Sequence, residues 1–276
     1  STLSSSSAAS DVYKRQLCKS LQFWILFLSL LLLKCNTDIS YDLKLIVLEK
    51  SKKFTTNDSL NFNIINKKCF LEMNKILGRS VITGFMRIEG QPFGLVASDC
   101  QQLGGAVDSE AAEKAAAFIE ICNARNLPIL SLVDTPGFMV GPDSELEGSV
   151  RRMATLLVSG AKITAPHIAI FLRKGYGLGA QAMVGGSFHD PIYTASWPTG
   201  EFGGMGLEGA VKLGFRKELE AETDPKKKED LYNKLVERSY EKGKAIEAAA
   251  HLEIDAVIDP ADTRKVILKA LKNRFI

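Results

Sequence analysis

Glycine and proline, on which tight turns depend most, are confined to the C-terminal part of this chain. All 22 glycines and all 9 prolines lie at or beyond Gly78. Residues 17–76 contain no glycine, alanine, arginine or proline, and are rich in residues with AT-rich codons such as lysine, asparagine and isoleucine. Because a globular domain needs turns, this distribution predicts that the evolved fold begins near Leu77.

The segment before Leu77 contains a sequence of a different kind from the rest of the chain. Residues 6–16 (SSAASDVYKRQ) match the translation of a transposase-type sequencing adapter. We therefore expect residues 1–76 to be an artefact of adapter and non-coding sequence, disordered or poorly packed, and residues 77–276 to form the functional domain. A signal peptide is the alternative, since the apolar residues 23–33 follow lysine and arginine. That run is shorter than the ~20 residues that span a bilayer, and no small-residue cleavage site follows it.

The composition disfavours several classes of function. A net charge of +3 over 276 residues is too small to indicate nucleic acid or a membrane surface as partner. The five cysteines lack the paired spacing of a zinc site or a redox motif, which predicts free thiols and a cytoplasmic location. The three histidines lie far apart and no HExxH occurs, so no metal site is expected.

From residue 77 onward, apolar periodicity predicts alternating strands and helices. The predicted strands cover residues 81–88, 92–98, 128–133, 167–172 and 192–197. The predicted helices cover residues 108–125, 144–160, a short stretch near Gly179, a charged region over 217–250, and 262–271. Repeated strand-strand-helix units indicate the α/β class.

The most informative loop is residues 173–183 (RKGYGLGAQAM), between a predicted strand and a short helix. The first amides of a helix lack internal partners and carry partial positive charge. Glycines there let a ligand oxygen approach the backbone. Such a loop can bind an anion or hold a developing oxyanion. A tight turn, in which glycine only permits close packing, carries equal weight on this pattern alone.

Two segments of the chain partly match well-known nucleotide-binding motifs. Residues 175–180 fit the dinucleotide pattern GxGxxG/A, with Glu201 about twenty residues further on. Glycines at 185 and 186 interrupt the helix that this motif requires, so the match is interpreted as accidental. Residues 134–137 (DTPG) are similar to the metal-binding loop of GTPases, but no GxxxxGK[ST] occurs. A sharp loop ending a strand is preferred.

Two further glycine clusters follow predicted strands. Gly104 and Gly105 precede the helix at residue 108 and could present amides, although a turn is the simpler interpretation. The cluster at residues 197–206 combines glycine with Trp197, Phe202 and Met205. Binding residues concentrate in such loops, so we expect this cluster to line a cleft.

Together, these motifs resemble the carboxyltransferase β subunits of biotin-dependent acyl-CoA carboxylases, of the propionyl-CoA and acetyl-CoA type. The resemblance rests on six segments in order, at residues 83–88, 134–138, 173–177, 197–200, 205–211 and 258–264. It implies a crotonase-like (ClpP/crotonase) fold with two homologous domains per subunit, of which this chain resembles the C-terminal one. The missing N-terminal domain would carry most of the acyl-CoA site and face a neighbouring subunit, so a homo-oligomer is expected.

The implied function is transfer of CO2 between carboxybiotin and an acyl-CoA. Biotin would be the cofactor, carried by a biotin carboxylase/biotin carboxyl carrier subunit, with no metal in this chain. Two other hypotheses stay open. One is a hydratase or isomerase of the same fold, which needs a carboxylate over the α-carbon, for which Glu201 is the loop candidate. The other is an inactive fragment.

The resemblance also implies site residues. An amide pair that holds the ureido oxygen of biotin falls on Gly179 and Ala180 as the catalytic residues, and no catalytic side chain is expected. The implied substrate-binding residues are Tyr176, Gly177, Gln181, Gly104 and Gly105. Many family members read Gly-Ala-Tyr-Asp where this chain has Gly179-Ala180-Gln181-Ala182, and Leu178 looks inserted. The acyl preference and the one-residue register of the pair therefore stay open.

Overall fold

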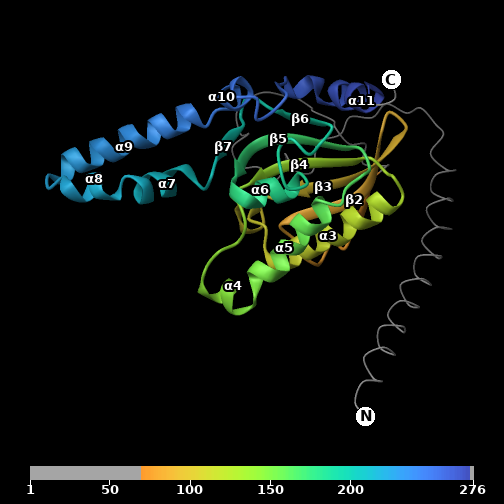
Figure 1. The fold of residues 1–276 in the computed structure, drawn as a ribbon, viewed down its shortest axis with the longest axis horizontal. Coiled ribbons are helices and arrows are strands. Elements are labelled where there is room, and N and C mark those ends of the chain that lie inside the picture. The colour runs from red at the N-terminus through yellow and green to blue at the C-terminus, as the bar shows by residue number, and fades with distance from the viewer. Residues whose placement is uncertain (1–69, 274–276) are drawn as a thin grey trace, which may run out of the picture. The chain divides into compact units, whose positions relative to one another are not determined.

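One eight-stranded sheet organises the part of the chain that the computed structural model describes, residues 70–273 (Figure 1). Its order is β1-β2-β3-β4-β5-β6-β8, with β7 pairing on β5. The bounds are β1 Leu71–Met73, β2 Val81–Ile88, β3 Gln91–Ser98, β4 Ile129–Thr135, β5 His167–Tyr176, β6 Tyr193–Ser196, β7 Glu201–Gly203 and β8 Ala256–Val257. The first three strands pair antiparallel and all later pairs are parallel.

The sheet begins upstream of Leu77. Strand β1 pairs with β2 from Leu71 opposite Phe85 to Met73 opposite Thr83. The Thr83 hydroxyl donates a hydrogen bond of 3.0 Å to the carbonyl of Met73. The predictions of an adapter at residues 6–16 and of a signal-like run at 23–33 lie outside the described residues.

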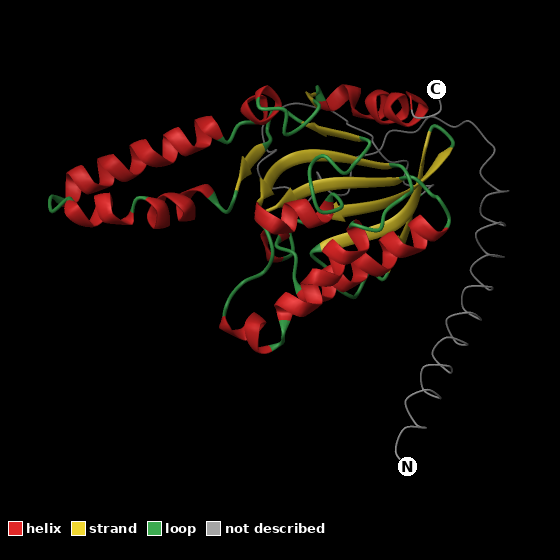
Figure 2. Ribbon diagram, viewed as in Figure 1, coloured by secondary structure: helices red, strands yellow, loops and turns green. Residues whose placement is uncertain are grey.

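Apolar residues alternate between the two faces of the central strands. On β5, Ile168, Ile170 and Leu172 join a core under helix α11 (Thr263–Asn273). Ala169 and Phe171 join a second core under helices α3 (Ser109–Ala124) and α5 (Ser149–Gly160). Helices therefore cover both faces, as parallel strands require (Figure 2).

The predicted helices form, with one correction. Helix α3 begins after Asp108, whose carboxylate accepts a hydrogen bond of 2.8 Å from the amide of Ala111 and caps the helix. The single helix predicted over 144–160 is wrong, because α4 (Pro142–Leu146) and α5 are separate helices. Gly148 lies between them with φ of 68°, a left-handed conformation that ends a helix.

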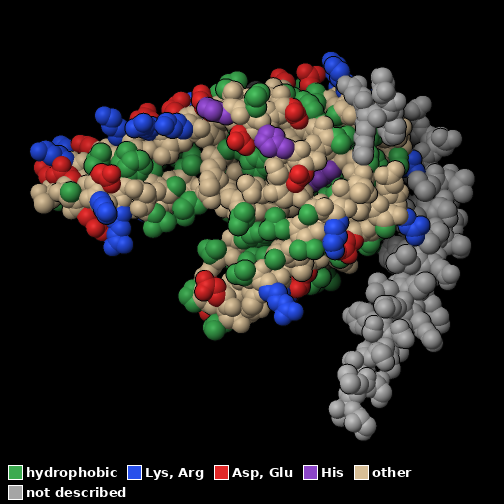
Figure 3. Space-filling view, in the orientation of Figure 1, with side chains coloured by type: hydrophobic (Ala, Val, Ile, Leu, Met, Phe, Trp, Pro, Cys, Tyr) green, Lys and Arg blue, Asp and Glu red, His purple; other side chains and the backbone are tan. Residues whose placement is uncertain are grey.

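The charged region at 217–250 contributes to a helical arm that extends away from the sheet (Figure 1). We define the arm as α7 (Leu207–Gly214), α8 (Arg216–Ala221) and α9 (Pro225–Lys242), in which α7 packs on α9. Lysine and arginine side chains follow its outer surface (Figure 3), and α10 (Ala245–Ala250) returns the chain to the sheet. Within residues 70–273, no helix is long and apolar enough to cross a membrane.

Candidate active site

The carboxyl ends of β3, β4 and β5 meet at one edge of the sheet, because these strands are parallel. A short 3-10 helix, η2 (Leu103–Gly105), follows β3. The loop of residues 136–141 follows β4, and α6 (Gly177–Met183) follows β5. In Figure 1, α6 lies against the ends of β4 and β5. This is the edge at which parallel α/β sheets bind ligands.

Close backbone packing positions the first turn of α6. A Cβ at Gly179 would lie 2.5 Å from both the carbonyl carbon of Gly137 and the nitrogen of Phe138. Gly177 has φ of 61°, and a Cβ there would lie 2.8 Å from the carbonyl oxygen of Gly204. Both positions therefore need glycine, so the close-packing interpretation of this loop holds, and the helix start lies directly on the loop after β4.

The start of α6 determines which amides are free of the helix. With Tyr176 as the N-cap, the amides of Gly177, Leu178 and Gly179 precede the first bond of the i→i−4 ladder. The amide of Ala180 is the first in register to donate to the carbonyl of Tyr176. Of the predicted pair, helix geometry thus leaves Gly179 available as a donor and gives Ala180 an internal acceptor.

Tyr176 is buried and binds a neighbouring strand. Its hydroxyl donates a hydrogen bond of 2.9 Å to Oε2 of Glu201 on β7. Burial and then this hydrogen bond to the carboxylate raise the pKa of Tyr176, so the phenol stays protonated. The Glu201 carboxylate therefore accepts a hydrogen bond from a hydroxyl that stays protonated, on the residue that directly precedes α6.

A buried ion pair, which the sequence interpretation missed, joins the ends of β4 and β5. Arg173 Nε lies 3.1 Å from Oδ1 of Asp134, and a terminal guanidinium nitrogen lies 3.0 Å from Oδ2. The amide of Lys174 donates to the same carboxylate at 3.1 Å. Burial alone would lower the pKa of Arg173, but the hydrogen bond and charge of Asp134 outweigh it and raise that pKa. The sequence signal that could have predicted this pair is a pair of opposite charges at the ends of two consecutive apolar strands.

Cys100 lies beside this ion pair. Its thiol donates to the backbone carbonyl of Asp134 at 3.3 Å. Burial, reinforced by the Asp134 carboxylate, raises the pKa of the thiol to about 12. Cys100 and Cys122 are both free, and Cys100 stays a neutral thiol at physiological pH.

The other predicted substrate-binding residues lie at the same edge, in two groups. Gly104 is exposed with open space at its missing Cβ, whereas Gly105 is buried, and its Cβ would lie 2.4 Å from the carbonyl oxygen of Asp134. This pair reaches α6 through the loop after β4, since the amide of Val107 donates to Gly137 at 3.0 Å. Gln181 is half-buried, and its backbone carbonyl accepts from the amides of residues 184 and 186.

The expectation that residues 197–206 line a cleft is wrong for Trp197, the largest residue of this cluster. Trp197 is fully buried in the core under α11, and its Nε1 donates to the Thr263 hydroxyl at 3.0 Å. Phe202 packs on Phe171, with ring centroids 4.9 Å apart. The aromatic residues of this cluster therefore stabilise the core, because burying a large apolar surface is favourable.

Parallel strands covered on both faces, with glycine loops at their carboxyl ends, define a crotonase-like α/β fold, as predicted. The chain belongs to the family described as "Carboxyl transferase domain", whose profile matches residues 35–274. The match starts upstream of Leu77, in the part of the chain that the structure does not describe.

Individual relatives carry carboxyltransferase names. The chain is 34% identical over 245 residues to the methylmalonyl-CoA carboxyltransferase 12S subunit of Propionibacterium freudenreichii subsp. shermanii, covering 86% of this chain and 45% of that protein. It is 34% identical over 211 residues to the propionyl-CoA carboxylase beta chain of Saccharopolyspora erythraea, covering 76% of this chain and 38% of that protein.

Among solved structures, a single-chain, multi-domain long-chain acyl-CoA carboxylase is 48% identical, with a TM-score of 0.67, over 75% of this chain and 20% of its own. A transcarboxylase 12S structure, described as a hexamer assembly, is 33% identical with a TM-score of 0.70, over 76% of this chain and 40% of its own. The chain thus spans less than half the length of the relatives that it matches.

Proposed function

We propose that this chain is the biotin-facing half of a carboxyltransferase that moves a carboxyl group between carboxybiotin and an acyl-CoA. The observation that carries this proposal is the α6 turn, where the backbone of Gly179 is held against Gly137 and Phe138 in a member of the carboxyl transferase family. Carboxybiotin, delivered by a carrier subunit, supplies the carboxyl group.

The donor set fits a cyclic urea. A ureido oxygen is a neutral acceptor that gains negative charge as the carboxyl group leaves. Preorganised amides at a helix start stabilise such charge without moving. By helix geometry, Leu178 and Gly179 offer adjacent free amides and form one candidate pair. Gly179 with Ala180, the pair that the sequence predicts, is the other register.

The hydratase alternative needs a carboxylate free to act on an α-carbon. Glu201, its loop candidate, accepts a hydrogen bond from the buried Tyr176 hydroxyl instead. In this chain Glu201 therefore serves to tie β7 to the start of α6, which favours carboxyl transfer through backbone donors.

Exposed apolar side chains surround the candidate site. Leu103, Val140, Leu178 and Met205 are 53%, 81%, 63% and 41% exposed, and each lies in the segment that follows a different strand, β3, β4, β5 or β7. A surface of this kind is typical of an interface. We propose that the domain missing from this chain, in the same or a neighbouring subunit, covers it and brings the acyl-CoA.

The acyl group has two candidates. The motifs resemble propionyl-CoA and acetyl-CoA carboxylases, and the curated propionyl-CoA carboxylase relative is 34% identical. The long-chain acyl-CoA carboxylase is 48% identical, although it is matched over only 20% of its length. We propose a short-chain acyl-CoA as the first substrate to test and a long-chain acyl-CoA as the specific alternative.

The test is transfer of labelled carboxyl from carboxylated carrier to acetyl-, propionyl- or palmitoyl-CoA, with the missing half supplied. The chain alone should transfer nothing. In the assembled enzyme, the side chain of Gly179→Val should push the amide out of position and lower kcat/KM by about 100-fold, the effect of losing an oxyanion donor. Gly214→Ala on the arm should leave kcat/KM unchanged. Ala180→Val and Leu178→Pro then report the register.

Full activity in both Gly179→Val and Ala180→Val would refute the assigned site. Hydration of an enoyl-CoA without biotin would establish the alternative enzyme class. Activity of the isolated 276-residue chain would contradict the proposal that it is half of a site.

A further inference from the structure

The far end of α6 is attached to the sheet by two buried polar side chains. The hydroxyl of Ser131 on β4 donates to the carbonyl of Met183, the last residue of α6, at 2.7 Å. Nε2 of His167 on β5 lies 2.9 Å from the same hydroxyl oxygen. Because the single Ser131 proton goes to Met183, the imidazole is the donor to Ser131.

These polar groups stand in an apolar setting. Ile129 and Val133, on the same face of β4, belong to the core that also contains Ala182 and Met183 of α6. Ser131 is 0% exposed and His167 is 2% exposed. A buried hydroxyl is costly unless it is hydrogen-bonded, and the last carbonyls of a helix lack internal partners. The hydrogen bond from Ser131 to Met183 gives the buried hydroxyl an acceptor and gives the helix carbonyl a donor.

Two other carbonyls near this end also accept hydrogen bonds. The Gln181 carbonyl accepts from the amides of Val184 and Gly186, at 3.0 and 2.8 Å. The Ala182 carbonyl accepts from Gly185 at 3.4 Å. The carbonyls of Gln181 and Ala182 thus accept from the following residues of the chain, whereas Met183 accepts from a side chain of the sheet.

We infer that Ser131 and His167 are positioning residues for α6, which hold its C-terminal end so that the amides at its N-terminal end keep their place. Their importance for carboxyl transfer rests on the proposed function. Helix α6 has seven residues and is therefore only about 10 Å long. A helix this short moves as one body, so a displacement at Met183 is passed to Gly179, where backbone contact leaves no room to adjust.

The inference is tested on the whole chain by amide hydrogen exchange. Ser131→Ala should speed exchange of the helical amides at residues 180–183 by about tenfold, the equivalent of one buried hydrogen bond. Ser131→Thr, which keeps the hydroxyl, should restore slow exchange. His167→Leu should have a smaller effect, because Ser131 can still donate to Met183.

The matched control is Thr83→Val, which also removes a fully buried hydroxyl that donates to a backbone carbonyl, at 3.0 Å to Met73. It should leave exchange in α6 unchanged. If Ser131→Ala speeds exchange equally throughout the sheet, or leaves α6 unaffected, the positioning role is refuted.

In the assembled enzyme, Ser131→Ala should lower kcat for transfer while the KM for acyl-CoA stays unchanged, since the proposed function places the acyl-CoA site on the other half. If the unsubstituted enzyme transfers no carboxyl group, the proposed function fails, and the exchange experiment still decides whether Ser131 positions α6.

Discussion

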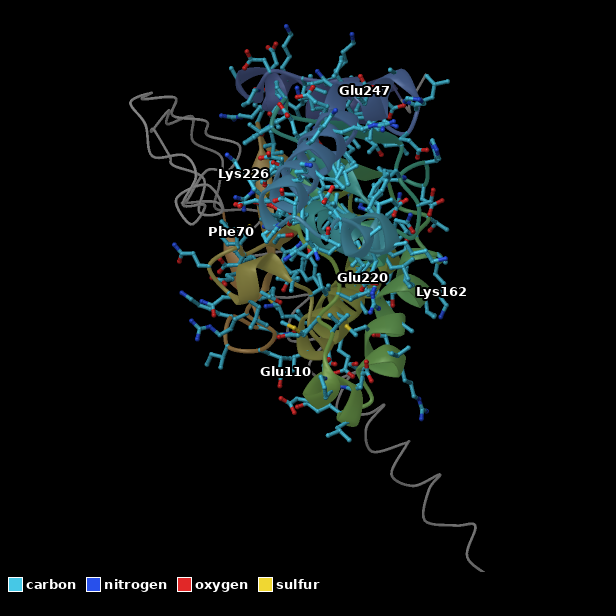
Figure 4. The ribbon with its side chains drawn as sticks, turned by 90° about the vertical axis from the view of Figure 1, so that its left-hand side faces the viewer. Phe70, Glu110, Lys162, Glu220, Lys226 and Glu247 are labelled. Carbon is cyan, nitrogen blue, oxygen red and sulfur yellow. The ribbon has the colours of Figure 1, made fainter. Side chains whose placement is uncertain are left out.

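Helices α6 and α9 are stabilised in opposite ways. The seven residues of α6 include four that are buried, Gly179, Ala180, Ala182 and Met183, and both of its ends contact the sheet or its loops. The eighteen residues of α9 include none that is buried. Glu220 in α8 and Lys226 in α9, both labelled in Figure 4, lie on either side of the turn between these two helices of the arm.

The difference shows how each helix can be identified. Helix α9 carries its own signals, with Asp224 as N-cap accepting from the amide of Lys226 at 2.9 Å and with Pro225 in its first turn. Helix α6 has no side-chain cap and contains two glycines, which are poor helix formers. Its conformation is imposed by tertiary contacts with the sheet and with the loop after β4.

The largest expected contrast is between two ion pairs, one at the edge of the sheet beside α6 and one on the arm. Asp134→Asn leaves Arg173, whose side chain is 15% exposed, without its buried counter-charge, and should lower the free energy of unfolding by about 3 kcal/mol. Glu220→Gln breaks the exposed pair with Arg216, whose side chains are 61% and 71% exposed. It should lower the free energy of unfolding by no more than about 0.5 kcal/mol. Urea denaturation of both variants measures this; equal losses would contradict the contrast.

A smaller contrast is expected from adding one methyl group to a glycine. Gly179→Ala places a Cβ 2.5 Å from backbone atoms of Gly137 and Phe138, and overpacking of this kind costs about 2 kcal/mol. Gly214→Ala, at the end of α7, meets nothing within 4 Å and should be neutral or slightly stabilising. The melting temperatures of the two variants measure the difference. A neutral Gly179→Ala would show that α6 can move away from the loop after β4.

A third expected effect depends on pH. Burial lowers the pKa of His167 to about 4, from an ordinary value of 6.5. Between these values the unfolded chain binds the proton more readily than the folded chain. The stabilising contribution of neutral His167 is therefore complete above about pH 6.5, and falls by up to about 1.4 kcal/mol per pH unit as the pH drops toward 4.

His167→Gln should remove this part of the pH dependence, as measured by urea denaturation at pH 7 and pH 5. The control is the unsubstituted chain measured at the same two pH values. An unchanged dependence in His167→Gln would mean that this imidazole is not held neutral by burial.

Several features follow from the local sequence. The β2–β3 hairpin forms from residues 81–98 because apolar residues flank the turn at Glu89 and Gly90. Helix α3 begins at Ser109, within one residue of the predicted start at residue 108. The glycine loop at residues 173–183 leads into a helix, and the six motifs spaced along the chain identify the carboxyl transferase family. Each of these depends on neighbours in the chain, so a single sequence is sufficient to predict it.

Other features depend on residues far apart in the sequence. The sequence predicts one helix over 144–160, but a left-handed Gly148 divides it, and Trp197 lies in the core and not beside a cleft. The sequence determined that glycines, strands and amides would meet at one edge of an α/β sheet. Only the tertiary structure decided that Arg173 pairs with Asp134, that Tyr176 binds Glu201, and that Ser131 and His167 hold the end of α6, because hydrogen bonds between buried side chains depend on register and packing, which local periodicity does not encode.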